Sequence, residues 1–258
     1  MRALDQIDAW PAHVAAAAVV RSGGEIVASR GPADLHLPWA SVTKLVTALV
    51  CLTAVEDGLL ELDEPAGPPG STVRHLLAHA SGLPFDGGSP IGRPGERRIY
   101  SNAGIEQAAA LVEARAGRPF ASLLPAGWAG RLVGSPAYGY VGPLTDLVAL
   151  ATILLEPDWT PAAEFPGLPG VLPGFGRQEP NDWGLGFEIR DAKSPHWTGS
   201  RNSPRTFGHF GRSGTFLWVD PDARLALACL TDLEFGDWAV EAWPRLSDAV
   251  LGEAARAA

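Results

Sequence analysis

A long apolar run over residues 41–56 places the strongest constraint on how this chain can fold. It begins with Ser41-Val42-Thr43-Lys44 and stops at Asp57-Gly58. The run predicts a helix that ends at Asp57-Gly58, because glycine is common just past the end of a helix. Leucine, valine and alanine leave that helix almost no polar face, and a helix that is apolar all round is buried. The fold must therefore enclose this helix together with its lysine.

Ser41 and Lys44 are a candidate nucleophile and base. Three residues apart on a helix, they lie on one face with Cβ atoms about 5 to 6 Å apart. Serine needs a nearby base to become nucleophilic, and burial lowers the pKa of a lysine so that it can be that base. The positive end of the helix dipole would favour an alkoxide at Ser41. For an isolated Ser-x-x-Lys the alternative is that Ser41 caps the helix while Lys44 reaches solvent.

Composition limits the classes of function. With 258 residues and 46% hydrophobic content, the chain can form one large domain or two small interleaved ones. A net charge of -9 without a basic run argues against binding to nucleic acid or an anionic membrane. Residues 1–8 do not resemble a secretory signal, so we expect a cytoplasmic protein, unless an export signal has been removed. Cys51 and Cys229 lie in apolar runs and are expected in the core, unpaired.

The order of expected elements is strand-rich at both ends and helical between them. The expected strands are 13–20, 25–29, 183–189, 215–219 and 224–230, and the expected helices are 41–56, 73–79, 103–116, 144–155 and about 237–255. Residues 157–204 are rich in Pro, Gly and Trp, with little periodicity apart from the strand at 183–189. A stretch this long and irregular is either a lid over a site or a linker.

Two weaker patterns lie between the helices. Tyr100-x-Asn102 stands just before a helix, where two side chains two residues apart in a turn can share a site; alternatively Ser101 or Asn102 only caps the helix. His75 and His79 have the spacing of a zinc pair. Leucine follows the first histidine where a zinc protease has glutamate, and no third ligand is evident, so we expect packing residues and no metal or other cofactor.

Three short motifs follow one another along the chain in a fixed order, and together they are more specific than any one alone. They are Ser41-x-x-Lys44, Tyr100-x-Asn102 and His209-Phe210-Gly211. Together with residues 72–83, 100–104 and 207–211 they resemble the penicillin-binding protein and class C β-lactamase superfamily of serine hydrolases, whose motifs are Ser-x-x-Lys, Tyr-x-Asn and Lys/His-Thr-Gly. The resemblance covers nearly the whole chain. It implies an α+β fold, with an antiparallel sheet flanked by helices and an inserted all-helical domain. Residues 1–40 and 165–258 would form the sheet domain and 41–164 the helical domain, with the site at their interface.

The resemblance also implies roles for individual residues. It assigns catalysis to Ser41, Lys44 and Tyr100, and substrate binding to Asn102, His209, Gly211 and Arg212. Ser41 would be acylated, while Lys44 and Tyr100 take its proton and pass it to the leaving group. His209 would replace the motif's lysine as partner of Tyr100. Backbone N–H groups of Ser41 and Arg212 would form the oxyanion hole.

These roles make an esterase or amidase acting on a small molecule the expected function. A D-alanyl peptidase or a β-lactamase is the alternative, and a slow-turnover acyl-binding receptor is the alternative outside enzymes. Phe210 stands where the family usually has threonine, whose hydroxyl helps bind a substrate carboxylate, so neutral esters are expected to be preferred. An α/β-hydrolase is disfavoured because Gly211-Arg212-Ser213-Gly214-Thr215 lacks the last glycine of that fold's nucleophile elbow. The oligomeric state stays open.

Overall fold

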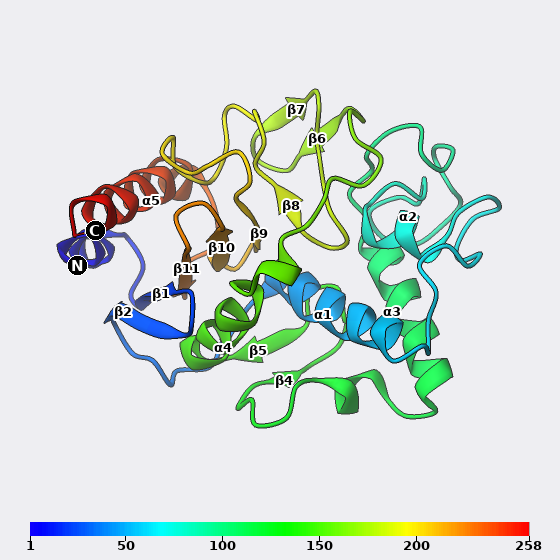
Figure 1. Ribbon diagram of the computed structural model, residues 1–258, viewed down its shortest axis with the longest axis horizontal. Helices are drawn as coiled ribbons and strands as arrows, with labels where there is room; N and C mark the ends of the chain where they lie inside the picture. Colours follow the sequence, from blue (N-terminus) through cyan, green and yellow to red (C-terminus); the bar gives the residue numbers. More distant parts are fainter. Residues whose placement is uncertain (258) are drawn as a thin grey trace.

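A six-stranded antiparallel sheet forms the centre of the protein in the computed structural model, which describes residues 1–257 (Figure 1). Its strand order is β2-β1-β11-β10-β9-β8. The strands are β1 (Ala15–Arg21), β2 (Glu25–Arg30), β8 (Glu188–Ile189), β9 (Phe207–Phe210), β10 (Phe216–Asp220) and β11 (Leu225–Thr231). β1 pairs with β11 from Ala15 opposite Thr231 to Arg21 opposite Leu225, so the two ends of the sequence meet inside one sheet.

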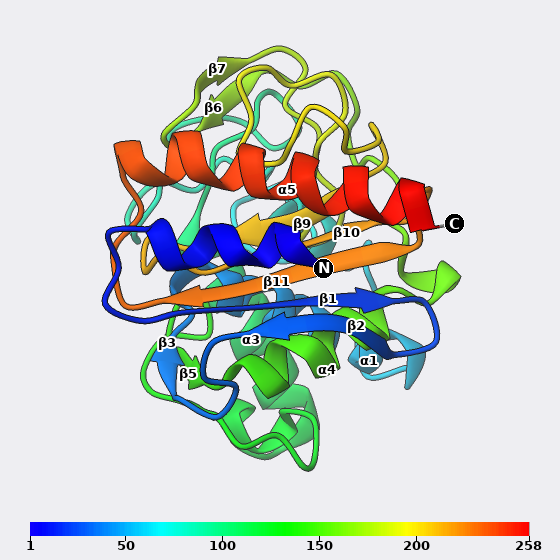
Figure 2. The ribbon, with the colours of Figure 1, turned by 90° about the vertical axis from the view of Figure 1, so that its left-hand side faces the viewer.

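Alternation along the strands assigns each side chain to one of two layers. In β1, Ala17 and Val19 belong to the core beneath α5 (Asp237–Ala257) and the 3-10 helix η1 (Arg2–Ala9). The intervening alanines and Val20 belong to the core beneath α1 (Thr43–Glu56) and α4 (Leu144–Leu154). The protein therefore has three layers, with η1 and α5 together on one face of the sheet (Figure 2).

The remaining helices pack around the far end of α1. They are α2 (Val73–Leu77) and α3 (Asn102–Ala116), whose apolar side chains form a third core with those of α1 (Figure 1). Short 3-10 helices are η2 (Ala40–Val42), η3 (Phe120–Leu123) and η4 (Pro157–Trp159). Small sheets are formed by β3 (Leu37–Pro38), β4 (Arg131–Leu132) and β5 (Tyr140–Gly142), and by β6 (Gly170–Leu172) with β7 (Gly176–Gln178). None of the helices within residues 1–257 is long and apolar enough to cross a membrane.

The expected α+β fold is confirmed, and the strands and helices lie within a few residues of their expected positions. The largest difference is in residues 157–204. There the chain has an unexpected hairpin, β6–β7. Of the strand expected at 183–189, only Glu188–Ile189 forms a strand, β8, while the preceding residues make a tight turn in which Trp183 bridges to Glu188. Gly186 makes this turn with a φ of 86°, a conformation that interrupts a strand. The domain boundaries stay a prediction, although α4, from the expected helical part, packs on the sheet.

Both cysteines are confirmed as core residues. Cys51 and Cys229 are buried and unpaired, and burial raises the pKa of the Cys51 thiol to about 12. The thiol of Cys229 has its pKa raised by burial as well. Neither cysteine is therefore a reactive thiolate at neutral pH.

Candidate active site

Ser41 lies in a strained turn where the sheet meets the first long helix. Its predecessor Ala40 has a φ of 44°, a left-handed conformation that is costly for alanine. Trp39 anchors the turn, because its indole N–H donates to the Gly142 carbonyl at 3.1 Å and its backbone N–H donates to Tyr140 at 2.9 Å. Gly211, just past β9, lies so close that a Cβ there would be 2.3 Å from the Trp39 oxygen. Close packing of two backbones thus places Ser41 beside the end of β9.

Lys44 is fully buried and has three oxygen neighbours. Its Nζ is 3.2 Å from Ser41 Oγ, 2.7 Å from Asn102 Oδ1 and 2.9 Å from the Ala137 carbonyl oxygen. Burial lowers the pKa of Lys44 to about 7, and the nearby carboxylates of Glu106 and Asp86 oppose that decrease. The expected desolvation of Lys44 is therefore confirmed. Ala137 could not be found from the sequence, because a backbone carbonyl carries no residue signature.

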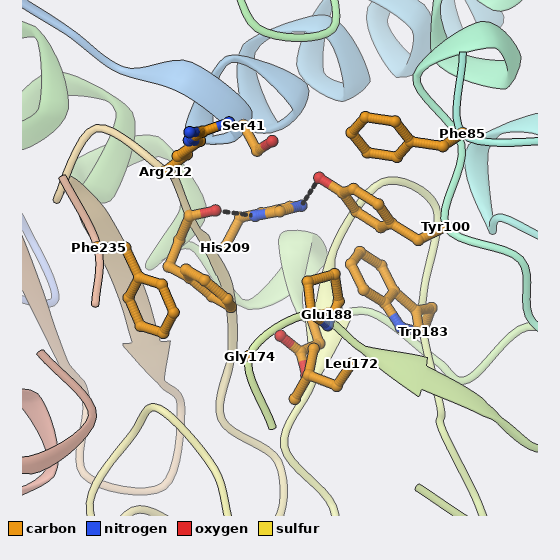
Figure 3. A pocket seen from close by; sticks show the side chains of 12 residues that line it. Ser41, Phe85, Tyr100, Leu172, Gly174, Trp183, Glu188, His209, Arg212 and Phe235 are labelled. Atoms are coloured by element: carbon orange, nitrogen blue, oxygen red, sulfur yellow. Dashed lines mark hydrogen bonds between the residues drawn. The ribbon is translucent and has the colours of Figure 1, made fainter. Parts of the chain in front are cut away.

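Tyr100 and His209 form a hydrogen-bonded pair across the site (Figure 3). Tyr100 Oη is 3.2 Å from His209 Nε2, and His209 Nδ1 is 2.6 Å from the Phe210 carbonyl oxygen. Since a carbonyl can only accept, Nδ1 carries the proton and Tyr100 donates to Nε2. Burial and then the charge of Lys44 lower the pKa of His209 to about 3, so the ring is neutral. His209 is consequently a hydrogen-bond acceptor for Tyr100 and supplies no positive charge.

Tyr100 keeps its own proton at neutral pH. Burial raises the pKa of its phenol above the ordinary value, against a smaller lowering by the Ser41 hydroxyl. The Lys44 ammonium nitrogen lies 4.8 Å from the centre of the Tyr100 ring. Of the two groups beside the serine, Lys44 is therefore the one that titrates near neutrality.

Asn102 connects Lys44 to a loop that the sequence did not single out. Its Oδ1 accepts from Lys44, and its Nδ2 donates to Asp86 Oδ1 at 3.1 Å. The same loop caps helix α3, since the Phe85 carbonyl accepts the Asn102 N–H at 2.8 Å. Ser101 is confirmed as the helix cap, because its hydroxyl accepts from Gly104 N at 3.0 Å. Asp86 thereby orients the Asn102 amide with its oxygen toward the lysine.

Of the two histidines only His79 packs against Tyr100, and it lies beyond the end of α2 at Leu77, with a φ of 54°, rather than on the helix expected at 73–79. His79 is buried, and its Nδ1 accepts the Ser101 N–H at 3.2 Å, while its ring lies 4.6 Å from that of Tyr100. Burial, followed by the charge of Lys44, holds the pKa of His79 well below the ordinary value. His75 instead contacts Thr72 Oγ1 at 2.9 Å and packs on Phe165. These contacts confirm the expectation of packing and hydrogen-bonding residues.

A largely apolar cavity of about 320 Å³ opens at Ser41. Its walls carry Phe85, Tyr100, Leu172, Pro173, Gly174, Trp183, Glu188, His209, Phe210, Arg212 and Phe235. Figure 3 shows Ser41 at one end, and Leu172 and Glu188 at the other. The site unites the three expected motifs. Much of its apolar wall comes from Phe85, Leu172, Pro173 and Trp183, which the sequence analysis did not name individually, although it expected residues 157–204 to be a lid or a linker.

Glu188 is a buried carboxylate at the far end of the cavity. Its oxygens contact His196 Nε2 at 3.1 Å, Lys193 Nζ at 3.4 Å and the Trp197 indole N–H at 2.7 Å. Burial would raise the pKa of Glu188, but Lys193 and His196 outweigh it and lower the pKa to about 2. The ionised Glu188 carboxylate forms a buried ion pair with Lys193, so Lys193 is not free to bind a second carboxylate at this end of the cavity.

Arg212 lies at the cavity mouth with its side chain 83% exposed. Its Nε is 3.4 Å from Glu234 Oε2, an exposed pair that stabilises little. The side chain thus lies in solvent rather than in the cavity. Gly211 holds the Arg212 backbone next to the Ser41 turn, where both N–H groups were expected.

Comparison with known proteins identifies relatives along nearly the whole chain. A family model described as Beta-lactamase matches residues 5–126 and 123–251. The crystal structure of a β-lactamase from Mycobacterium bovis is 49% identical, with 98% of this chain and 99% of that chain covered and a TM-score of 0.94. No match was found among curated protein sequences.

Two more distant structures share the fold. A mutant of simvastatin synthase LovD from Aspergillus terreus is 15% identical, covers 98% of this chain and 93% of its own, and has a TM-score of 0.74. EstCE1, described as a hydrolase with promiscuous acyltransferase activity, is 17% identical and also has a TM-score of 0.74. The match covers 97% of this chain and 96% of EstCE1. At these identities the likeness concerns the fold alone.

Proposed function

The chain belongs to the β-lactamase family, and from that premise we propose that it is a serine hydrolase that forms an acyl-enzyme on Ser41. Its substrates are small esters or amides. The observation that carries the proposal is the arrangement around Lys44, where a buried amine with a pKa of about 7 lies 3.2 Å from the serine hydroxyl. A cytoplasmic location and a small-molecule partner, rather than nucleic acid or a membrane, belong to the same proposal.

The hydrogen-bond pattern supports Lys44 as the base. A neutral amine has two hydrogens and one lone pair. The carbonyl oxygens of Asn102 and Ala137 can take both hydrogens, which leaves the lone pair for the Ser41 proton. Ser41 Oγ then attacks the substrate carbonyl while its proton moves to Lys44. Tyr100, which keeps its proton, is placed to relay one to the leaving group, and Lys44 restores it.

The oxyanion is assigned to the backbone N–H groups of Ser41 and Arg212. Gly211 supports this assignment, because only a residue without Cβ allows β9 to approach the Ser41 turn so closely. Loss of one oxyanion donor typically costs about 10²- to 10³-fold in rate. Water then hydrolyses the acyl-enzyme, with Lys44 as base in the second half of the cycle.

The cavity supports uncharged acyl groups. Its walls are mainly aromatic and aliphatic, and Phe210 cannot donate the hydrogen bond that the family's threonine gives to a carboxylate. Such a bond to a charged group is worth about 1.5 to 3 kcal/mol. The β-lactamase alternative is favoured by the Mycobacterium bovis relative at 49% identity. Neutral short-chain esters are nonetheless proposed to exceed penicillins in kcat/KM.

One experiment separates the candidates. The protein is exposed to a fluorophosphonate, p-nitrophenyl esters, a penicillin and a D-alanyl amide, and intact mass and turnover are followed together. We expect one fluorophosphonate adduct on the wild type, none on Ser41→Ala, and turnover of the esters. Labelling of Ser81, Ser101 or Ser213 would refute the nucleophile. A stable acyl adduct without turnover indicates the receptor alternative, and faster penicillin hydrolysis indicates the β-lactamase.

A further inference from the structure

A second hollow adjoins the active-site cavity and shares Phe85, Tyr100 and Pro173 with it. We call it the outer groove; its volume is about 360 Å³, and its remaining walls are Ile91, Arg97, Arg98, Ile99, Pro169, Gly170, Val171 and Arg177. The cavity and the outer groove thus adjoin at these three side chains.

The outer groove exposes apolar side chains that a protein normally buries. Phe85, Ile91 and Val171 are 51%, 57% and 62% exposed, and they lie along one groove beside the nucleophile. Single exposed apolar residues are ordinary, but a cluster next to a site indicates a bound apolar group. An apolar chain that continues out of the cavity would cover these three side chains.

The same groove is cationic on a protein that is acidic overall. Within residues 1–257 its walls contain three arginines and no Asp or Glu, although the chain has 29 acidic against 20 basic residues. Arg98 is buried and donates to the backbone carbonyls of Ala78, Glu164, Phe165 and Asn181, with no direct carboxylate contact. Burial lowers the pKa of Arg98 to about 10, so it remains charged at neutral pH.

The other two arginines keep donors for a ligand. Arg97 uses one Nη to donate to the Ile91 carbonyl at 2.8 Å, and a guanidinium has five N–H donors in all. Arg177 pairs at 3.0 Å with Glu179, but both side chains are more than 60% exposed and such a pair is weak. A carboxylate can pair with a guanidinium through two bonds, so it can compete for either arginine.

We infer that the outer groove binds the distal part of the leaving group, an apolar chain that ends in a carboxylate. The inference rests on the proposed acyl-enzyme chemistry. Tyr100 borders both hollows and is the group proposed to protonate the leaving group, so that group departs past Tyr100 and into the groove. The anionic end belongs outside because the walls of the inner cavity are mainly apolar, and Lys193 is already paired with Glu188.

The test compares esters that share one acyl group. They are ethyl butyrate, an ω-(butanoyloxy)alkanoate with a long chain, and the methyl ester of that alkanoate, which has the same length without the charge. We expect the alkanoate to have the highest kcat/KM, through KM, and added salt to reduce its advantage. A long-chain dicarboxylic monoester that carries the charge on the acyl side should gain nothing.

Variants identify the groove. In Arg97→Gln/Arg177→Gln the ratio of kcat/KM between alkanoate and methyl ester should fall about tenfold, as expected for two exposed charge contacts. Val171→Ser should lower kcat/KM for both long substrates relative to ethyl butyrate. It should have little effect on stability, because Val171 is already exposed. Arg93→Gln removes one arginine charge from the loop that carries Arg97, at a position outside the groove walls, and it should keep the wild-type ratio.

Two failures are distinguishable. If no ester is hydrolysed and Ser41 is not labelled, the proposed function fails. If ethyl butyrate is hydrolysed but the alkanoate is no better than its methyl ester, or if Arg93→Gln lowers the ratio as much as the double variant, the inference about the groove is wrong. A preference for the charge on the acyl side would likewise overturn the assignment to the leaving group.

Discussion

Lys44 determines how the proposed activity depends on pH. It accepts the serine proton only when neutral, and burial lowers its pKa to about 7. Ester turnover should therefore rise with pH through about 7 and then level off, far below the ordinary lysine value. Tyr100, His79 and His209 also face this amine, so the observed pKa belongs to a coupled group. Lys44→Met should lose about 10²- to 10⁴-fold in turnover while remaining folded. Near-native turnover would remove the lysine from the mechanism.

Asp86 and Glu106 adjust that pKa from two different elements. Both carboxylates raise the pKa of Lys44 against the effect of burial. Asp86→Asn and Glu106→Gln should each move the rising limb of the pH–rate profile to lower pH, since the ammonium form loses a stabilising charge. Glu56→Gln is the matched control, because Glu56 is exposed at the other end of α1, about 18 Å along the helix from Lys44. A limb that stays in place in Asp86→Asn would contradict this electrostatic role.

Phe210 shows what could and could not be predicted for a single residue. The sequence shows that it occupies the family's threonine position and cannot donate a hydrogen bond. It does not show that the ring is 8% exposed and packs against Phe175, Phe235 and Trp243. Truncating a buried aromatic ring costs about 3 to 5 kcal/mol, so Phe210→Thr changes stability together with specificity. Such packing is set by side chains distant in the sequence, which local patterns do not reveal.

At the scale of elements, the approach of β9 to the turn at η2 is the most sensitive contact of the site. In Gly211→Ala the new Cβ meets the Trp39 oxygen at 2.3 Å, so one segment must move. We expect kcat to fall about 100-fold, since small displacements of reacting groups have effects of that size, and stability to fall by about 1 to 3 kcal/mol.

Gly236→Ala is the matched control for that change. Its Cβ would meet only Trp238 Cδ1, at an ordinary 3.9 Å. Activity assays and urea titrations of both variants separate the two effects. Equal loss of activity in Gly236→Ala, or none in Gly211→Ala, would show that the approach of β9 does not position Ser41.

Some helices and strands could be predicted from the sequence more reliably than others. Helix α3 could be predicted at both ends, because Ser101 caps it and Gly117 ends it with a φ of 66°. Strands β1 and β2 were evident from their apolar runs and the intervening glycines. The hairpin β6–β7 lies among Pro and Gly residues and has only three residues per strand, so its stability comes from tertiary contacts with no local signature. The cavity wall at residues 172–174 was missed for the same reason.

On the scale of the whole molecule, one hydrophobic core joins the expected domains. Side chains of β1 and β10, such as Val20 and Leu217, belong to the same buried cluster as Leu45 of α1 and Leu150 of α4. We expect a single cooperative unfolding transition, because neither part can lose its partner without exposing this core. Far-UV and near-UV circular dichroism should give superimposable urea curves. Two separated transitions would show that the helical part folds independently.

The pairing of β1 with β11 has a practical consequence for dividing the chain. The loop around Gly127 is exposed, a Cβ there would meet no atom within 4 Å, and the two matches to the family model meet at residues 123–126. Two polypeptides divided between Ala126 and Gly127 would hold Ser41, Lys44 and Tyr100 on one piece and His209 on the other. Each piece would also carry one half of the central strand pair. Fused to two proteins that bind each other, the pieces would act as a split reporter, in which ester hydrolysis signals that the fusion partners have met.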